Sequence, residues 1–431
     1  MNTLIVIITT CVLFLFPLRI KQKVTRYFYY IVCGFISLTL FVSIANPFEL
    51  YEVSTKAYVF ISLGFIFWGL GYIKRHRVNH NTNVIVEHDS VSSLFKSRRL
   101  FFTYVASFCF LLYLAITQWQ FILINGAMLN LKTDTFEIIF NNNSMMYLFY
   151  QCVSFPLFYL SIALFSYLYI TKGSRLYLTI FFLYILLFCY IGGKRGYFQT
   201  TIEGFFIIYI LVNLKKGLSL FQMMRSSYRL LIFICILYLG AAYMTSIGGG
   251  GGDLKSAGNE NAKNLVVYNV GAYRAFDYAL DKNFYEKSNG PHYGAATFGG
   301  FIEYYSTNIF NRIGLNTRSV RENTMTLLQD TPITVGNGVD FNFLYTSFMY
   351  FYFDFGVLGI LLISFMFGWF VRYIVDVFAF ENTFSSIGLV SYIFISCILF
   401  PAGWFNVALS AQPTLLMFYV LRNNELKNKR L

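Results

Sequence analysis

Long apolar runs alternate with short polar stretches along almost the whole chain. Each run has about the ~20 residues that an α-helix needs to cross ~30 Å of hydrocarbon. The pattern therefore predicts an all-α, polytopic transmembrane bundle of about eleven spans. The predicted spans cover residues 2–18, 27–45, 57–73, 100–122, 147–170, 176–192, 197–214, 230–247, 355–372, 383–400 and 405–421.

One polar stretch, residues 248–344, is large enough to form a domain that carries a site. It opens at Gly248–Gly252, a run of glycines that is typical of a flexible tether. Apolar residues spaced for one helical face predict two amphipathic helices in it, at 267–280 and about 297–313, lying on the membrane surface. The predicted organisation is spans one to eight in 1–247, this helical loop in 248–344, and the last three spans with a tail in 345–431.

Composition supports the membrane interpretation. Hydrophobic residues make up 57% of the chain and charged residues 12%, whereas a soluble domain carries roughly 25% charged residues. The formal net charge is +13, which in a soluble protein would suggest a nucleic-acid partner. In a membrane protein the positions of the charges decide their meaning.

Lysine and arginine in short loops predict the orientation. With the N-terminus outside, most of the 33 basic residues fall on the cytoplasmic side, and the 248–344 loop lies outside. The positive charge is then an orientation signal, and no nucleic-acid partner is expected. The basic residues assigned to the inside are Arg19, Lys21, Lys23, Arg26, Lys74, Arg75, Arg77, Lys96, Arg98, Arg99, Lys172, Arg175, Lys215, Lys216, Arg225, Arg229, Arg372, Arg422, Lys427, Lys429 and Arg430.

Several classes of site are disfavoured by the motifs. All seven cysteines lie in predicted spans, so no disulfide framework is expected in the loop. No His/Cys group has zinc-site spacing and no Asp-x-Asp pair occurs, so we expect no metal site. The glycines around 192–196 lack the spacing of a phosphate-binding loop, so we expect neither ATP nor another cofactor.

The link Gly192-Gly193-Lys194-Arg195-Gly196 joins two predicted spans and places two cations outside. Glycine lets a ligand approach the backbone, and arginine binds phosphate in two places, so the link predicts an anion site for a lipid phosphate or pyrophosphate. Alternatively, both cations extend to lipid headgroups. Glu203 lies deeper in the next span, where a carboxylate is either functional or hydrogen-bonded to a neighbouring helix.

A second cationic group lies in the outside loop. Arg318 and Arg321 are three residues apart, with Arg312 and Arg274 upstream. This group predicts a second anion-binding surface, or else a solvated face paired with acidic neighbours. Asp354, beside glycines at the outer end of the ninth span, is a candidate base or alternatively the N-cap of that span.

At these residues the chain resembles the Wzy-type O-antigen and oligosaccharide repeat-unit polymerases of bacterial envelopes. It shares with that family a late dominant outside loop and a glycine-flanked arginine link between mid-chain spans. The matching segments are Gly192–Gly196, Tyr293-Gly294 within Pro291–Gly300, and Asn342–Tyr345 running into Tyr352–Gly356 and Gly359.

The resemblance implies a GT-C-like glycosyltransferase in the bacterial inner membrane, with the N-terminus periplasmic and the C-terminus cytoplasmic. Its donor and acceptor would be undecaprenyl-pyrophosphate-linked oligosaccharides, joined into O-antigen or capsular polysaccharide by metal-independent, inverting transfer. Membrane lipid is a further partner, and the resemblance leaves room for a chain-length regulator. An O-antigen ligase of the same architecture and a polysaccharide or lipid flippase are the alternatives.

Such a transfer needs cations on the pyrophosphate and a base for the acceptor hydroxyl. The expected cations are drawn from Lys194, Arg195, Arg274, Arg312, Arg318 and Arg321. For the base we rank Asp354 first, His292 second and Glu303 third.

Overall fold

The computed structural model describes most of the chain. The described residues are 1–74, 97–125, 139–141, 143–192, 195–218, 222–223, 254–300, 306–307, 309–311, 313–315, 320–329, 333–336, 339–341, 345–381, 383–404 and 408–428.

The described helices support a multi-pass helical membrane protein. Seven of them are long and apolar enough to cross a membrane: Asn2–Arg19, Lys23–Ala45, Thr55–Ile73, Arg98–Ile124, Ser144–Thr171, Gly196–Lys215 and Ser347–Phe380. Two shorter apolar helices, Arg175–Ile191 and Phe384–Leu399, match two more predicted spans. The predicted span 230–247 lies outside the described residues. For the predicted span 405–421, the described helix begins only at Ala411.

The chain divides into two compact units, each assembled from segments far apart in the sequence. Unit 1 comprises Met1–His80, Asn264–Ala379 and Ser396–Gln412. Unit 2 comprises Asn81–Lys263, Phe380–Ile395 and Pro413–Leu431. Residues of the large loop therefore pack with the first three helices in unit 1.

Four apolar helices belong to unit 1 in the described chain: α1 (Asn2–Leu15), α2 (Lys23–Ala45), α3 (Thr55–Ile73) and α18 (Ser347–Phe380). A 3-10 turn, η1 (Phe16–Arg19), follows α1 and contains Pro17, whose ring cannot continue an α-helix. The side chain of Ser54 accepts the amide of Ala57 and caps α3. Asn46, in the left-handed region, ends α2.

Helices α3 and α18 approach each other at two glycines. A Cβ atom on Gly368 would lie 1.9 Å from the carbonyl oxygen of Trp68. A Cβ atom on Gly71 would lie 2.0 Å from that of Phe365. Glycine is therefore required on each helix, as is common where membrane helices pack backbone to backbone.

Helix α18 is broken near its start. Phe355 has φ −144° and ψ 21°, and Gly356 has φ 61° and ψ −142°, so the helical path stops and resumes there. Gly356 adopts a conformation that other residues rarely reach. The ninth predicted span began at residue 355, so the break falls at its expected start, and two helical turns precede it.

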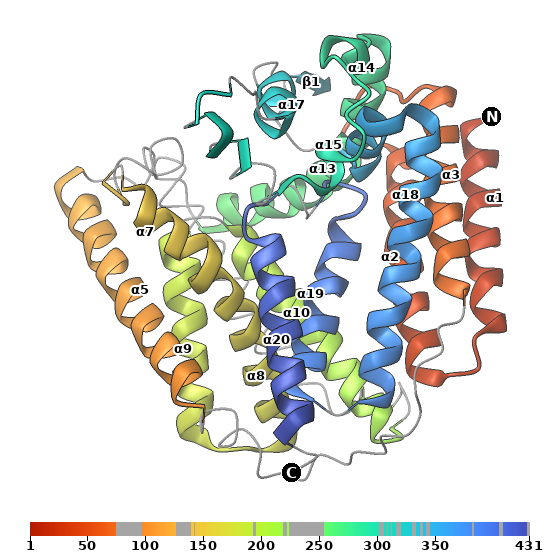
Figure 1. The fold of residues 1–431 in the computed structure, drawn as a ribbon. Coiled ribbons are helices and arrows are strands. Elements are labelled where there is room, and N and C mark those ends of the chain that lie inside the picture. The colour runs from red at the N-terminus through yellow and green to blue at the C-terminus, as the bar shows by residue number, and fades with distance from the viewer. Residues whose placement is uncertain are drawn as a thin grey trace. The chain divides into compact units, whose positions relative to one another are not determined.

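Residues of the large loop pack at the end of unit 1 where α1 starts, hereafter the Asn2 end (Figure 1). The elements are α13 (Leu254–Asp281), α14 (Phe284–Lys287), α15 (Ala295–Phe298), α17 (Val320–Gln329), β1 (Ile333–Gly336) and β2 (Val339–Phe341). Strands β1 and β2 pair antiparallel, and the amide of Tyr51 donates to the carbonyl of Val335 at 2.8 Å. The α2–α3 connection thus joins the edge of this hairpin.

The two amphipathic helices predicted in the large loop agree with the structure to different extents. The first, at 267–280, is confirmed as a helix, the later part of α13, but residues 270–277 are all buried within the protein, so they do not form the surface helix that was predicted. In the second, at about 297–313, α15 ends at Phe298 and Gly299 interrupts the helix, while 300, 306–307 and 309–311 are helical. Residues 301–305, 308 and 312 lie outside the described residues, so one continuous helix stays a prediction. The β1–β2 hairpin was not predicted.

Unit 2 holds α5 (Arg98–Asn125), α7 (Ser144–Phe149), α8 (Phe155–Thr171), α9 (Arg175–Gly192), α10 (Arg195–Lys215), the first part of α19 (Phe384–Leu399) and most of α20 (Ala411–Asn428). A π-helical turn, η3 (Tyr150–Ser154), separates α7 from α8. Pro156 lies just after it and has no amide hydrogen to donate to the preceding turn, which accounts for the irregularity.

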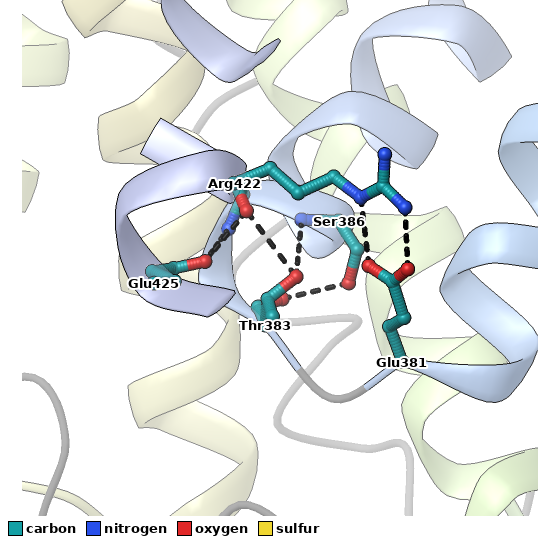
Figure 2. A network of polar contacts seen from close by, with 6 residues as sticks. Glu381, Thr383, Ser386, Arg422 and Glu425 are labelled. Atoms are coloured by element: carbon teal, nitrogen blue, oxygen red, sulfur yellow. Dashed lines mark hydrogen bonds and ion pairs between the residues drawn. The ribbon is translucent and has the colours of Figure 1, made fainter. Parts of the chain in front are cut away.

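A polar network connects α20 with α19 and the residues just before it, at the end of unit 2 where α10 finishes (Figure 2). Arg422 of α20 donates from Nε to Glu381 at 2.8 Å, forming an ion pair. Lys215 of α10 donates to the Glu381 carbonyl at 2.9 Å. Glu425 accepts both the hydroxyl and the amide of Ser385, which satisfies an open amide at the start of α19.

Basic residues gather at one end of each unit in the described chain. In unit 1 they are Arg19, Lys21, Lys23, Arg26 and Lys74, and in unit 2 Arg98, Arg99, Lys172, Arg175, Lys215, Lys216 and Lys427. Arg372 is an exception to the loop position predicted for it, because α18 continues to Phe380. Its guanidinium is buried and pairs with Asp376 at 2.6 Å.

Candidate functional site

Asp354 lies at the break in α18 and is fully buried. Its two carboxylate oxygens accept the amides of Ala296 at 3.0 Å and Thr297 at 2.9 Å. These amides belong to the first turn of α15, where amides have no partner within the helix. Asp354 therefore caps a helix, as the alternative interpretation of this residue proposed, but the helix is α15 of the loop and not its own span.

The segment from His292 to Phe298 is held by three further hydrogen bonds. The amide of His292 donates to the carbonyl of Phe353 at 3.2 Å. The indole of Trp404 donates to the carbonyl of Thr297, and the side-chain amide of Gln412 to that of Phe298, each at 2.7 Å. Helix α18, the segment that contains Trp404 and the first turn of α20 thus fix the backbone of this short loop region.

His292, the second-ranked candidate base, lies in unit 1 and is partly exposed. Its Nε2 lies 3.1 Å from the hydroxyl of Ser288, and that hydroxyl donates to the carbonyl of Tyr285 at 2.8 Å. Because the Ser288 hydroxyl already donates its only proton to the Tyr285 carbonyl, the imidazole of His292 must be the donor in the His292–Ser288 hydrogen bond. Nε2 is then the protonated nitrogen, and Nδ1 is the basic one in the neutral ring.

Arg274, an expected pyrophosphate ligand, is enclosed by protein acceptors. Its Nε donates to the carbonyl of Tyr51 at 2.7 Å. Its two terminal nitrogens donate to Val270, to Asn46 and twice to Ser43 at 2.9–3.2 Å. Guanidinium has five N–H groups, so in this conformation protein atoms accept all of them. Burial lowers the pKa of this arginine, and the hydrogen bonds fasten α13 to the end of α2.

Asp277, one turn beyond Arg274, extends the same attachment. Its carboxylate accepts the amide of Ser54 at 2.6 Å and also the Ser54 hydroxyl. Ser54 caps α3, so Arg274 and Asp277 together connect α13 to both ends of the α2–α3 connection. The i, i+3 spacing of the two charges was visible in the sequence, but nothing in it indicated their partners.

Comparisons with protein-family models, with curated proteins and with solved structures found no match to this chain.

In unit 2, the expected anion site lies at the start of α10. Helix α9 ends at Gly192 and α10 begins at Arg195, so Arg195 belongs to the first turn of α10, where the positive end of the helix dipole lies. Lys194 itself and the side chain of Arg195 are outside the described atoms. Arg195 is at the opposite end of α10 from Lys215, away from the basic end of this unit.

Glu203 lies two turns further along α10. Gln199 donates an amide hydrogen to its carboxylate at 2.7 Å, and the side chain is partly exposed. A neighbouring glycine, Gly204, lies close to Ile162 and Ser391, so α10 packs tightly against α8 and α19 at this level. The hydrogen bond is made within one helix and not to the neighbouring span that the sequence suggested.

The other expected site residues are not brought together by the described part of the chain. Glu303, Arg312 and Arg318 lie outside the described residues. Arg321 belongs to α17, but its side chain is not described. Among the described residues, no group of three His, Cys, Asp or Glu side chains could hold a metal ion.

The sequence did not single out Tyr293 as a candidate site residue, although the Tyr293-Gly294 pair was noted. The side chain is 77% exposed, and its backbone has φ 51°, in the left-handed region. Its ring lies 6.2 Å from that of Phe355, at the break in α18. The only sequence signal was an aromatic residue before glycine in a polar turn.

Proposed function

We propose that this protein is an envelope glycosyltransferase that joins undecaprenyl-pyrophosphate-linked oligosaccharide units on the outer face of the inner membrane. The glycosyl pyrophosphate stores the energy of the new bond, so no nucleotide is needed there. In the transfer, the bond between the anomeric carbon and pyrophosphate breaks and a bond to the acceptor oxygen forms. The acceptor proton passes to a base, and undecaprenyl pyrophosphate leaves.

The observation that carries this proposal is that α10 begins at Arg195. An anion is favoured at a helix N-terminus by the dipole and the open amides, and a cationic residue there strengthens that preference. Arg195 is also at the opposite end of α10 from Lys215, which lies at the basic end of unit 2 where orientation alone would place cations. A leaving pyrophosphate develops negative charge that such groups stabilise.

For the base, the geometry favours His292 over Asp354. Asp354 is fully buried, with both oxygens accepting backbone amides. His292 is partly exposed, and its bond to Ser288 orients the ring. We therefore propose His292 as the acceptor-side base and Asp354 as the residue that positions its loop.

Arg195 gives the direct test. Arg195→Ala is expected to abolish polymer while the protein still inserts, and Arg195→Lys to retain little activity because the planar fork is lost. Polymer length on gels and protein level in the membrane fraction are measured together. Arg175→Ala, at the opposite end of α9, is the matched control and should leave polymer unchanged. Full polymer from Arg195→Ala would refute the role on pyrophosphate.

One observation favours a second function, transport of the lipid-linked glycan. Helix α18 is discontinuous at Phe355–Gly356, and broken helices are common at transporter binding sites. The buried Arg372–Asp376 pair also lies within this helix. A ligase of the same architecture is the third candidate carried over from the sequence.

Lipid analysis of a deletion strain separates these three functions. Loss of a polymerase leaves single repeats on the final acceptor. Loss of a ligase leaves long chains on the carrier lipid. Loss of a flippase leaves neither single repeats on the acceptor nor long chains on the carrier lipid at the outer face.

A further inference from the structure

We infer that Tyr293 and Phe355 form a stacking surface for a sugar ring of the oligosaccharide substrate. The inference rests on the proposed function for the identity of the ligand, and on four features of unit 1 for the site. They are the exposure of both rings, the backbone of Tyr293, the attachment of its loop and the neighbouring imidazole.

The first feature is exposure at a fixed position. The side chain of Tyr293 is 77% exposed and that of Phe355 41% exposed, and their rings meet edge to face at 6.2 Å. A pyranose presents one face of C–H groups, which packs against an aromatic ring and leaves its hydroxyls free for polar groups. Two rings at an angle of 71° offer one face for stacking and one edge beside it.

The second feature is the backbone at Tyr293. Its φ of 51° is uncommon for a bulky residue, and glycine or asparagine would adopt it with less strain. Such conformations persist where the surrounding structure holds them, and they are concentrated at functional sites. A strained tyrosine whose ring is exposed contributes little to packing, so the conformation points to a role for the ring itself.

The third feature is what holds that backbone. Asp354 accepts the amides of Ala296 and Thr297, directly after Tyr293-Gly294, and Phe353 accepts the amide of His292, directly before it. The break in α18 places Phe355 next to these same acceptors. The break in α18 therefore provides Phe355, one ring of the pair, and also the hydrogen-bond acceptors of Phe353 and Asp354 that hold the loop of Tyr293, the other ring.

The fourth feature is the neighbouring polar group. His292 precedes Tyr293 and is oriented by Ser288 at 3.1 Å. The imidazole ring lies 6.2 Å from the ring of Phe353, two residues before Phe355 in the chain. The stacking surface and the proposed base then serve the same acceptor sugar.

The test uses substitutions at Tyr293 in the full-length protein reconstituted in liposomes. The probe is the lipid-linked repeat unit extracted from the source strain lacking this gene, and initial rates are measured against its concentration. Tyr293→Ala is expected to raise the apparent KM roughly two- to tenfold, the range for loss of one aromatic contact, with kcat little changed. Tyr293→Phe and Tyr293→Trp keep a ring and should behave as wild type.

Tyr293→Gly separates a stacking role from a structural one. Glycine adopts φ 51° without strain, so this variant should unfold at the same or a higher temperature than wild type, yet show the raised KM of Tyr293→Ala. Tyr51→Ala is the matched control, because Tyr51 lies at the same end of unit 1 and its side chain is 52% exposed. Its KM should not change.

An unchanged KM in both Tyr293→Ala and Tyr293→Gly would overturn the inference, as would Tyr293→Phe being impaired like Tyr293→Ala. Lower thermal stability of Tyr293→Ala without a KM change would assign the ring to the headgroup layer instead. If wild type makes no polymer, saturation-transfer NMR with the released oligosaccharide decides separately. Binding lost in Tyr293→Ala keeps the stacking surface and rejects the polymerase, whereas equal binding by both proteins rejects the surface.

Discussion

At the scale of single residues, two charged side chains have their roles set by the partners that surround them. Arg274 gives its five N–H groups to acceptors in or near α2 and its own helix. Asp354 receives two amides from α15. A buried charge is costly unless hydrogen-bonded, so each side chain holds the surrounding backbone in place.

Asp354 gives a prediction that separates a structural role from catalysis. An asparagine there can accept one amide but turns its own N–H₂ toward the other, leaving a buried donor without a partner at a cost of about 1–3 kcal/mol. Asp354→Asn should therefore lower the unfolding temperature in detergent. Glu286→Gln, an exposed carboxylate at the same end, should not. Normal stability with complete loss of polymer would instead identify Asp354 as the base.

At the scale of secondary-structure elements, glycines decide how closely helices pack. Gly71 and Gly368 face backbone carbonyls of the partner helix at distances that no side chain fits. Gly34 of α2, by contrast, has open space where a Cβ would lie. The same residue type in three apolar spans therefore has different consequences, set by what lies opposite.

Gly368→Ala is expected to separate α3 from α18 and to destabilise the protein by about 1–3 kcal/mol, as overpacking does. Gly34→Ala, with no atom within 4 Å of the added Cβ, should be neutral or slightly stabilising because alanine favours helix. Thermal unfolding of the two variants in the same detergent makes the comparison. Equal unfolding temperatures for both would contradict the close contact of α3 and α18.

At the scale of the whole molecule, most of the described basic residues share one end of each unit, whereas Lys56, Arg274, Lys282 and Lys287 of unit 1 lie at the Asn2 end. The positive-inside rule assigns that end to the cytoplasm. The Asn2 end of unit 1, where residues of the large loop pack, then faces outward. We propose this orientation for the chain as a whole.

Reporter fusions test the orientation. Fusions at Asn259, in the large loop, and at Asn424, near the end of α20, are expected to report opposite compartments, with Asn424 inside. Alkaline phosphatase is active only outside and green fluorescent protein fluoresces only inside, so each site is measured with both. The same compartment for both sites would exclude the predicted topology.

The hydropathy pattern was sufficient to predict the membrane class and most of the helices. A span must be long and apolar because the bilayer cannot satisfy open backbone groups. This requirement can be recognised from consecutive residues in the sequence. The helix of 267–280 followed from the same kind of local pattern. The later boundaries were less exact, because α18 begins eight residues before its predicted span and continues past Arg372.

The partners of individual residues were decided only by the tertiary structure. Asp354 meets Ala296 and Thr297, and Arg274 meets Ser43 and Tyr51, across long separations in sequence. A local pattern carries no record of such contacts, because they depend on how separate helices pack. For the same reason the strained, exposed Tyr293 beside Phe355 emerged only from the fold. The sequence determined which segments enter the membrane, whereas packing determined which charged groups are enclosed by protein and which rings face outward.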